Sequence, residues 1–173
     1  MDQLEFLQIE FLENSIKSYI IFGSILLLGL LLKSLISSYL RKIIYKLVGD
    51  KSNADGKSEF DQLLKKPLNY FLLIIILFFS FNSLSFPESW NLASSDKVGI
   101  KMILDKGVSL LIILTVFWTL LRVVDYVGVR LKHRAEKTES KVDDQLIPFA
   151  IEIGKVLVVI FGVLIILSNI FDV

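Results

Sequence analysis

The stretch Tyr19–Leu32, YIIFGSILLLGLLL, contains no charged residue and decides the class of protein to which this chain belongs. Apolar residues fill it almost continuously, without the polar face that a helix on the surface of a soluble protein carries. Extended to the nearest polar boundaries, the apolar run covers residues 16–36. As an α-helix this run is roughly 31 Å long, close to the hydrocarbon thickness of a bilayer. We therefore predict a membrane-spanning helix over residues 16–36.

Three further apolar runs of similar length predict spans over residues 68–86, 108–129 and 151–171. The chain has 173 residues, of which 54% are hydrophobic, and its mean hydropathy is +0.65. Because the apolar residues are gathered into four blocks, a soluble domain is not expected. The predicted fold class is an all-α integral membrane protein. Its four transmembrane helices are arranged as two tandem helical hairpins, residues 1–86 and 87–173.

Lysine and arginine are concentrated in two of the connecting segments. Of the 19 basic residues, eight lie in residues 33–67 and six in residues 122–150, whereas the segments on the opposite side hold four. The positive-inside rule places loops rich in lysine and arginine in the cytoplasm. We therefore predict an orientation with both termini outside (N-out/C-out) and both basic loops inside.

The two basic loops resemble each other, which indicates an internal parallel repeat. Each contains an Asp-Gln-Leu triplet, beginning at Asp61 or Asp144, and each triplet is followed by a proline and a span. A serine three residues before an acid suits a helix N-cap and first turn. We expect each cap to start a short amphipathic helix on the membrane surface, after which the proline turns the chain into the bilayer. The residues of these joins are Ser58, Asp61 and Pro67 in one copy and Ser140, Asp143 and Pro148 in the other.

The sequence lacks the residue patterns on which enzymes and cofactor-binding proteins depend. No cysteine and one histidine are present, which excludes thiolate catalysis and metal sites built from several His or Cys ligands. There is no phosphate-binding glycine loop or nucleophile elbow. The neighbours Asp143 and Asp144 point about 100° apart on a helix, so we interpret them as capping residues. We expect no enzyme activity, no catalytic or metal residue, no cofactor and no small-molecule substrate, and the net charge of +1 argues against nucleic-acid binding.

Charged residues lie near the ends of the predicted spans and not at their centres. Two pairs, Arg122 with Asp125 and Glu152 with Lys155, have i,i+3 spacing, so each pair can meet on one helix face. Cations at such positions extend to the membrane interface or contact anionic lipid headgroups. The absence of central charges argues against a proton relay or a voltage sensor within this chain. The residues that we assign to the lipid interface are Arg122, Arg130, Lys132, Arg134 and Lys155.

Two features predict how the spans pack. Trp118 lies within the third span and is expected to contact a neighbouring helix. Gly154 and Gly162 are eight residues apart and therefore share a face of the fourth span. Small residues on one face allow close approach of another helix.

The stretch Lys137–Phe149, KTESKVDDQLIPF, followed by a span and the ending Asn169–Val173, NIFDV, resembles the small-conductance mechanosensitive channel (MscS) family, in its members with extra N-terminal helices. The resemblance covers the last third of the chain specifically and the rest by general plan. It implies the peripheral, tension-sensing helices of an ion channel for osmotic pressure relief in a bacterial inner membrane. Membrane lipids would be its partners, and the full-length channel would be a homo-oligomer. The pore-lining helix would follow Val173, so the resemblance assigns no pore residue here.

Two other functions are compatible with four spans in a parallel repeat. A transporter or permease subunit would have a polar crevice near the membrane midplane, between the two halves. A membrane anchor or scaffold would act only together with another chain. A glycine- and alanine-rich helix encoded downstream of Val173 would favour the channel over both.

The predicted orientation can be tested by labelling single cysteines in intact cells. We expect a cysteine that replaces Lys46 or Arg134 to resist an impermeant thiol reagent, because both basic loops should face the cytoplasm. A cysteine that replaces Ser94, in the opposite loop, should react. The reverse labelling pattern would contradict the N-out/C-out topology.

Overall fold

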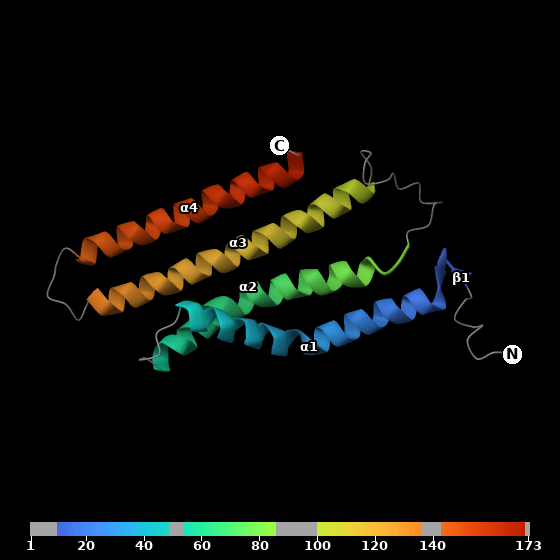
Figure 1. Ribbon diagram of the computed structural model, residues 1–173, viewed down its shortest axis with the longest axis horizontal. Helices are drawn as coiled ribbons and strands as arrows, with labels where there is room; N and C mark the ends of the chain where they lie inside the picture. The colour runs from blue at the N-terminus through green and yellow to red at the C-terminus, as the bar shows by residue number, and fades with distance from the viewer. Residues whose placement is uncertain (1–9, 49–53, 86–99, 136–142, 172–173) are drawn as a thin grey trace.

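The computed structural model describes residues 10–48, 54–85, 100–135 and 143–171 (Figure 1). These residues form four long helices and a small β-hairpin. All four helices are long and apolar enough to cross a membrane, which confirms the predicted all-α membrane class. The helices are α1, Ile16–Val48; α2, Ala54–Phe81; α3, Ile100–Ala135; and α4, Asp143–Phe171.

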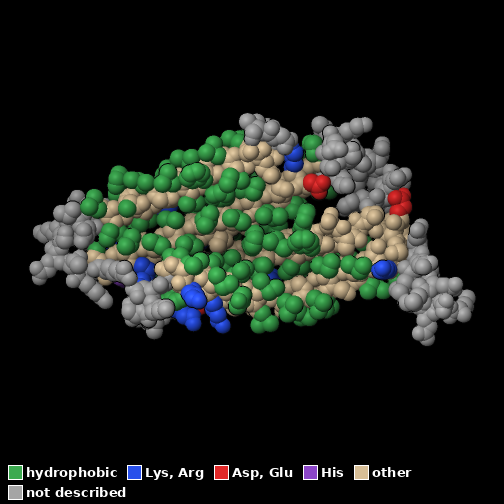
Figure 2. Space-filling view, viewed as in Figure 1, with side chains coloured by type: hydrophobic (Ala, Val, Ile, Leu, Met, Phe, Trp, Pro, Cys, Tyr) green, Lys and Arg blue, Asp and Glu red, His purple; other side chains and the backbone are tan. Residues whose placement is uncertain are grey.

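The four helices lie in sequence order in an open, antiparallel row (Figure 1). The principal helix contacts join α1 to α2, α2 to α3 and α3 to α4. The helices α1 and α4 therefore form the two edges of the row. Each edge helix has a face that no other described helix covers, and Figure 2 shows hydrophobic side chains spread over the visible side of the row. A surface of this kind is stable where lipid covers it.

The helices extend beyond the predicted spans at the end where the basic loops lie. The first span was expected over residues 16–36, and α1 begins at Ile16 as expected but continues to Val48. Its 33 residues make a helix roughly 50 Å long, against about 30 Å of hydrocarbon. No glycine or proline follows Gly29 within α1 to end the helix earlier. The last turns of α1 therefore project past the hydrocarbon layer.

The predicted surface helices and their proline turns are wrong in detail. The helix α2 begins at Ala54, so Ser58 lies inside it and does not cap it, and the helix continues through Pro67. The helix α4 begins at Asp143 and likewise continues through Pro148. An uninterrupted helix satisfies its own backbone hydrogen bonds, whereas a break at the membrane interface would leave them open. This gain outweighs the single hydrogen bond that each proline removes.

A ridge of buried residues runs along α2 at intervals of four residues. Its first member, Gly56, and its last, Ser80, both lie in buried positions. Residues spaced by four form a continuous ridge on a helix surface, which can fit into grooves of neighbouring helices. With this ridge, α2 is the most buried helix: 33% of its most apolar 18-residue stretch is buried, against 6% of the corresponding stretch in each of the other three helices. We call this set the α2 ridge: Gly56, Phe60, Leu64, Leu68, Leu72, Ile76 and Ser80.

The α2 ridge contacts α3 and α1 together at the basic end of the row. Phe60 lies edge-on to Tyr126 of α3, with 4.9 Å between ring centroids, and both side chains are fully buried. Tyr45 of α1 packs against both rings, at 5.2 Å from Phe60 and 6.3 Å from Tyr126. Edge-to-face aromatic pairs of this kind contribute about 0.5–1.5 kcal/mol beyond the area that they bury. This aromatic cluster joins the two helical hairpins.

Farther along the ridge, a glycine allows α1 to approach α2 closely. A β-carbon added at Gly29 would lie 2.6 Å from the Cγ2 atom of Ile76, too close for any larger residue without a shift. The expected close packing of α4 is also confirmed, since Gly162 lies against Phe117 of α3 and Gly154 lies near Val124 of α3. Glycines therefore set the helix separation in both hairpins.

The other packing prediction, for Trp118, is confirmed as well. Its indole stacks on Tyr70 of α2, with 5.9 Å between ring centroids. The contact lies on the α2–α3 interface, which also contains the aromatic cluster. The two hairpins are thus joined at more than one level of the row.

A short β-hairpin precedes α1 at the end of the row opposite the basic loops. Strands β1, Glu10–Phe11, and β2, Asn14–Ser15, pair antiparallel through a tight turn at Leu12 and Glu13, whose φ angles are +49° and +60°. The Asn14 side chain donates to the Ser85 carbonyl at 2.7 Å and accepts from the Ser85 amide at 2.7 Å. This pair of bonds ties the start of α1 to the chain that leaves α2.

Candidate functional site

Charged side chains at the basic end of the row form the candidate functional site. Asp125 on α3 is its centre in the second hairpin. Its Oδ2 atom accepts from Arg122 at 3.0 Å on the same helix, and its Oδ1 atom contacts the Lys155 ammonium of α4 at 2.8 Å. One carboxylate therefore holds two cations, one of them on the neighbouring helix.

The pairing differs in one respect from the sequence prediction. The Arg122–Asp125 pair on one face of α3 is confirmed. Lys155, expected to meet Glu152 on its own helix, is bound to Asp125 instead. A lysine has a long, flexible side chain that can extend to a neighbouring helix, and the α3–α4 separation is small here because Gly128 lies against Ile151. This ion pair therefore links α4 to α3.

Of the other assigned interface cations, Arg130 and Lys132 differ in their surroundings. Arg130 places its guanidinium carbon 6.0 Å from the centre of the Tyr126 ring, within the range of a cation–π contact. It also lies against Gly56 of α2, where an added β-carbon would be 2.7 Å from its Nη1 atom. Arg130 thus packs between α2 and α3, whereas Lys132 is exposed.

Three of the assigned side chains fall outside the described part of the structure. These are Arg134, Ser140 and Asp143, although the backbone places Arg134 in the last turn of α3 and Asp143 at the first position of α4. Asp61, assigned to the start of its helix, lies seven residues past the start of α2, where its carboxylate binds Arg41 of α1.

Asp61 belongs to a polar network in the first hairpin that the sequence analysis missed. The Nε atom of Arg41 donates to its Oδ1 atom at 2.9 Å and joins α1 to α2. The same guanidinium donates from Nη1 to Ser37 at 2.6 Å and from Nη2 to Ser38 at 3.0 Å. Serines four and three residues before an arginine were the signal for this network, but the first span was expected to end at residue 36, before all three residues.

The spans themselves hold hydroxyl groups that are satisfied within their own helices. Several described serine and threonine hydroxyls donate to main-chain carbonyls three or four residues earlier, as Ser80 does to Ile76 at 2.7 Å. Among the described residues, no group of three or more His, Cys, Asp or Glu side chains is placed to hold a metal ion. The other hydroxyls bonded in this way are Ser38, Thr115 and Thr119.

The chain was compared with protein-family models, with curated proteins and with solved structures, and none of these comparisons finds a match.

The cross-helix bond of Lys155 can be measured with a double-mutant cycle. We expect Asp125→Asn and Lys155→Met to couple by up to about 1 kcal/mol in the free energy of unfolding, because each removes the same partly exposed ion pair. The measurement is unfolding of the detergent-solubilised protein by SDS, followed by circular dichroism. Asp61→Asn with Lys155→Met is the matched control and should be additive, since Asp61 pairs with Arg41 in the other hairpin and shares no partner with Lys155. Additivity of Asp125→Asn with Lys155→Met would show that the Asp125–Lys155 ion pair does not stabilise the contact between α3 and α4.

Proposed function

We propose that this chain is the peripheral, membrane-tension-sensing region of an MscS-type mechanosensitive channel. The observation that carries the proposal is the exposure of the row. In each of α1, α3 and α4, only 6% of the most apolar 18-residue stretch is buried within the chain. Lipid or another subunit must cover the remainder, so the energy of the row depends on the state of the bilayer. The segment Lys137–Phe149 and the helix after it resemble the channel family. We therefore propose that this dependence on the bilayer serves to sense membrane tension.

An open row of helices can respond to tension through two physical effects. Stretching a bilayer favours protein states that occupy a larger area and thins the hydrocarbon layer. Helices that project past this layer then change their mismatch with it, and α1 is about 20 Å longer than the hydrocarbon is thick. Ion pairs such as Asp125–Lys155 would keep each hairpin together while the row tilts or spreads. The chain would thus be the sensor of the channel, and ions would pass elsewhere.

The proposal extends to location and partners. It places the chain in a bacterial inner membrane, in contact with membrane lipids, where opening of the channel would relieve osmotic pressure by ion efflux. Copies of the full-length protein would form a homo-oligomer. The uncovered edges of α1 and α4 are apolar, which suits either lipid or a second subunit.

A membrane scaffold is the second candidate, and the same uncovered edges favour it. A partner protein that spans the membrane could pack against α1 or α4 and use this chain as an anchor. A transporter has less support, because the hydroxyls of Ser80, Thr115 and Thr119 donate to the main chain of their own helices.

Patch-clamp recording tests the channel proposal. The host cells should lack mechanosensitive channels of their own and express the complete reading frame that contains this chain. We expect suction-activated currents from the complete reading frame, and no currents from residues 1–173 alone, because the proposal assigns ion conduction to another part of the channel. Removal of residues 1–173 should change the suction needed to open the channel.

A complete reading frame without suction-activated currents would contradict the channel proposal. Currents whose threshold is unchanged after removal of residues 1–173 would contradict the sensing role alone. Suction-activated currents from residues 1–173 by themselves would show that the conduit lies within this chain.

A further inference from the structure

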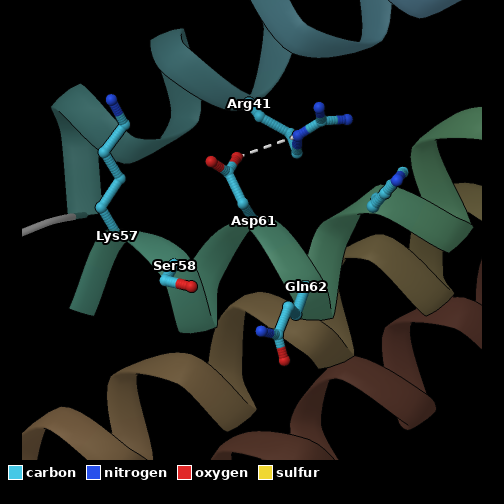
Figure 3. A pocket seen from close by; sticks show the side chains of 6 residues that line it. Arg41, Lys57, Ser58, Asp61 and Gln62 are labelled. Carbon is cyan, nitrogen blue, oxygen red and sulfur yellow. Dashed lines mark hydrogen bonds and ion pairs between the residues drawn. The ribbon is translucent and has the colours of Figure 1, made fainter. Parts of the chain in front are cut away.

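A shallow cavity of about 510 Å³, open to the surface, lies between α1 and α2 at the basic end of the row (Figure 3). On α2, three of its lining residues, Lys57, Asp61 and Lys65, recur every four residues and therefore share one helix face. This face lies beside the α2 ridge, so packing of the ridge fixes the backbone that carries it. The residues that line the cavity are Arg41, Lys57, Ser58, Asp61, Gln62 and Lys65.

The arginine in this cavity is held in place before any ligand arrives. Three of the five N–H donors of Arg41 are occupied by Asp61, Ser37 and Ser38, and its side chain is 12% exposed. Figure 3 shows Asp61 and Lys57 directed to the same side of α2 as Arg41. Because the guanidinium is already oriented, an anion would meet its remaining donors without ordering the side chain first.

The charges of the cavity are unbalanced. Arg41, Lys57 and Lys65 supply three positive charges, whereas Asp61 supplies one negative charge that its bond to Arg41 already engages. Two neutral groups, the Ser58 hydroxyl and the Gln62 amide, add hydrogen-bond donors. A small anion with several acceptor oxygens, such as a phosphate group, matches this combination of charge and donors.

The depth of the cavity indicates where such a phosphate would come from. Arg41 lies five positions after Ile36, the last residue of the predicted first span. At the rise of an α-helix this is roughly 7 Å beyond the hydrocarbon. The headgroup layer occupies roughly 5–8 Å on each side of the bilayer. Arg41, the cation that is held in place, therefore lies at the level of the lipid phosphates.

We propose that the cavity between α1 and α2 binds the phosphate group of an anionic phospholipid headgroup. Lys57 and Lys65 attract the phosphate from two sides, Arg41 provides fixed donors, and Asp61 keeps Arg41 oriented. The site does not depend on the channel proposal, because it requires only that the row spans a membrane. It would hold a lipid against the first hairpin at a defined position.

Native mass spectrometry of the detergent-solubilised chain tests the site, with phosphatidylglycerol as the ligand and zwitterionic phosphatidylcholine as the comparison. We expect tighter binding of phosphatidylglycerol, and roughly 10- to 30-fold weaker binding of it to the double variant Lys57→Gln, Lys65→Gln, since each lysine near a lipid surface contributes a several-fold effect. The variant Lys57→Arg, Lys65→Arg should keep most of the affinity. Lys57 and Lys65 are both exposed, and circular dichroism checks that each variant keeps its helices.

The matched control is Lys42→Gln, Lys46→Gln. These lysines are exposed at the same end of α1 but do not line the cavity, so the change in net charge is equal. We expect less than a twofold effect from the control. Equal loss in both double variants would overturn the proposal in favour of diffuse attraction to the whole basic end. Inorganic phosphate and glycerol 3-phosphate at millimolar concentration should leave the lipid bound, and its displacement would overturn the assignment to a lipid in favour of a soluble phosphate.

Discussion

Packing of the α2 ridge is the interaction on which the rest of the structure depends. A bilayer gives no hydrophobic drive for one apolar helix to leave lipid and join another, so close van der Waals contact must hold the helices together. The described structure concentrates that contact on α2, where Phe60 meets the aromatic side chains of α1 and α3 and Ile76 meets Gly29. A ridge with four-residue spacing drifts around the helix axis, which lets α2 contact α1 on one side and α3 on the other. The result is a row with two uncovered edges rather than a closed bundle.

The same bilayer controls where polar groups lie. The hydroxyls of Ser80, Thr115 and Thr119 bond within their own helices, and the cross-helix ion pairs lie toward the basic end. Both hairpins have such a pair, with reversed polarity. In the first, the cation Arg41 lies on the earlier helix and the anion Asp61 on the later one; in the second, Asp125 lies on the earlier helix and Lys155 on the later one. When the halves are aligned on their Asp-Gln-Leu triplets, Asp125 lies one position from the residue equivalent to Arg41. The two halves thus join their helices through different residues, which fits a repeat that has diverged.

The sequence was sufficient for the features that follow from hydrophobic length and local spacing. The four helices, the start of α1 at Ile16, the Arg122–Asp125 pair and the face shared by Gly154 and Gly162 are all of this kind. It was insufficient where a distant residue decides the outcome. Nothing near Lys155 in the sequence indicates that Asp125 on another helix binds it in preference to Glu152. The prediction of a turn at each proline was wrong for a related reason. Local rules treat Pro67 as a helix break, whereas the membrane favours an unbroken helix. The Asn14–Ser85 clamp joins residues 71 positions apart and has no local signal.

The most direct test of the α2 ridge compares Gly29→Val with Gly23→Val in the unfolding of the detergent-solubilised protein by SDS. A side chain at Gly29 would collide with Ile76, whereas an added β-carbon at Gly23 has no atom within 4 Å, so the two variants change the same helix by the same atoms. The account predicts that Gly29→Val lowers the free energy of unfolding by about 1–3 kcal/mol relative to Gly23→Val, which is the usual cost of overpacking. Equal stability of the two variants would contradict the close contact of α1 with the α2 ridge, and with it the open row.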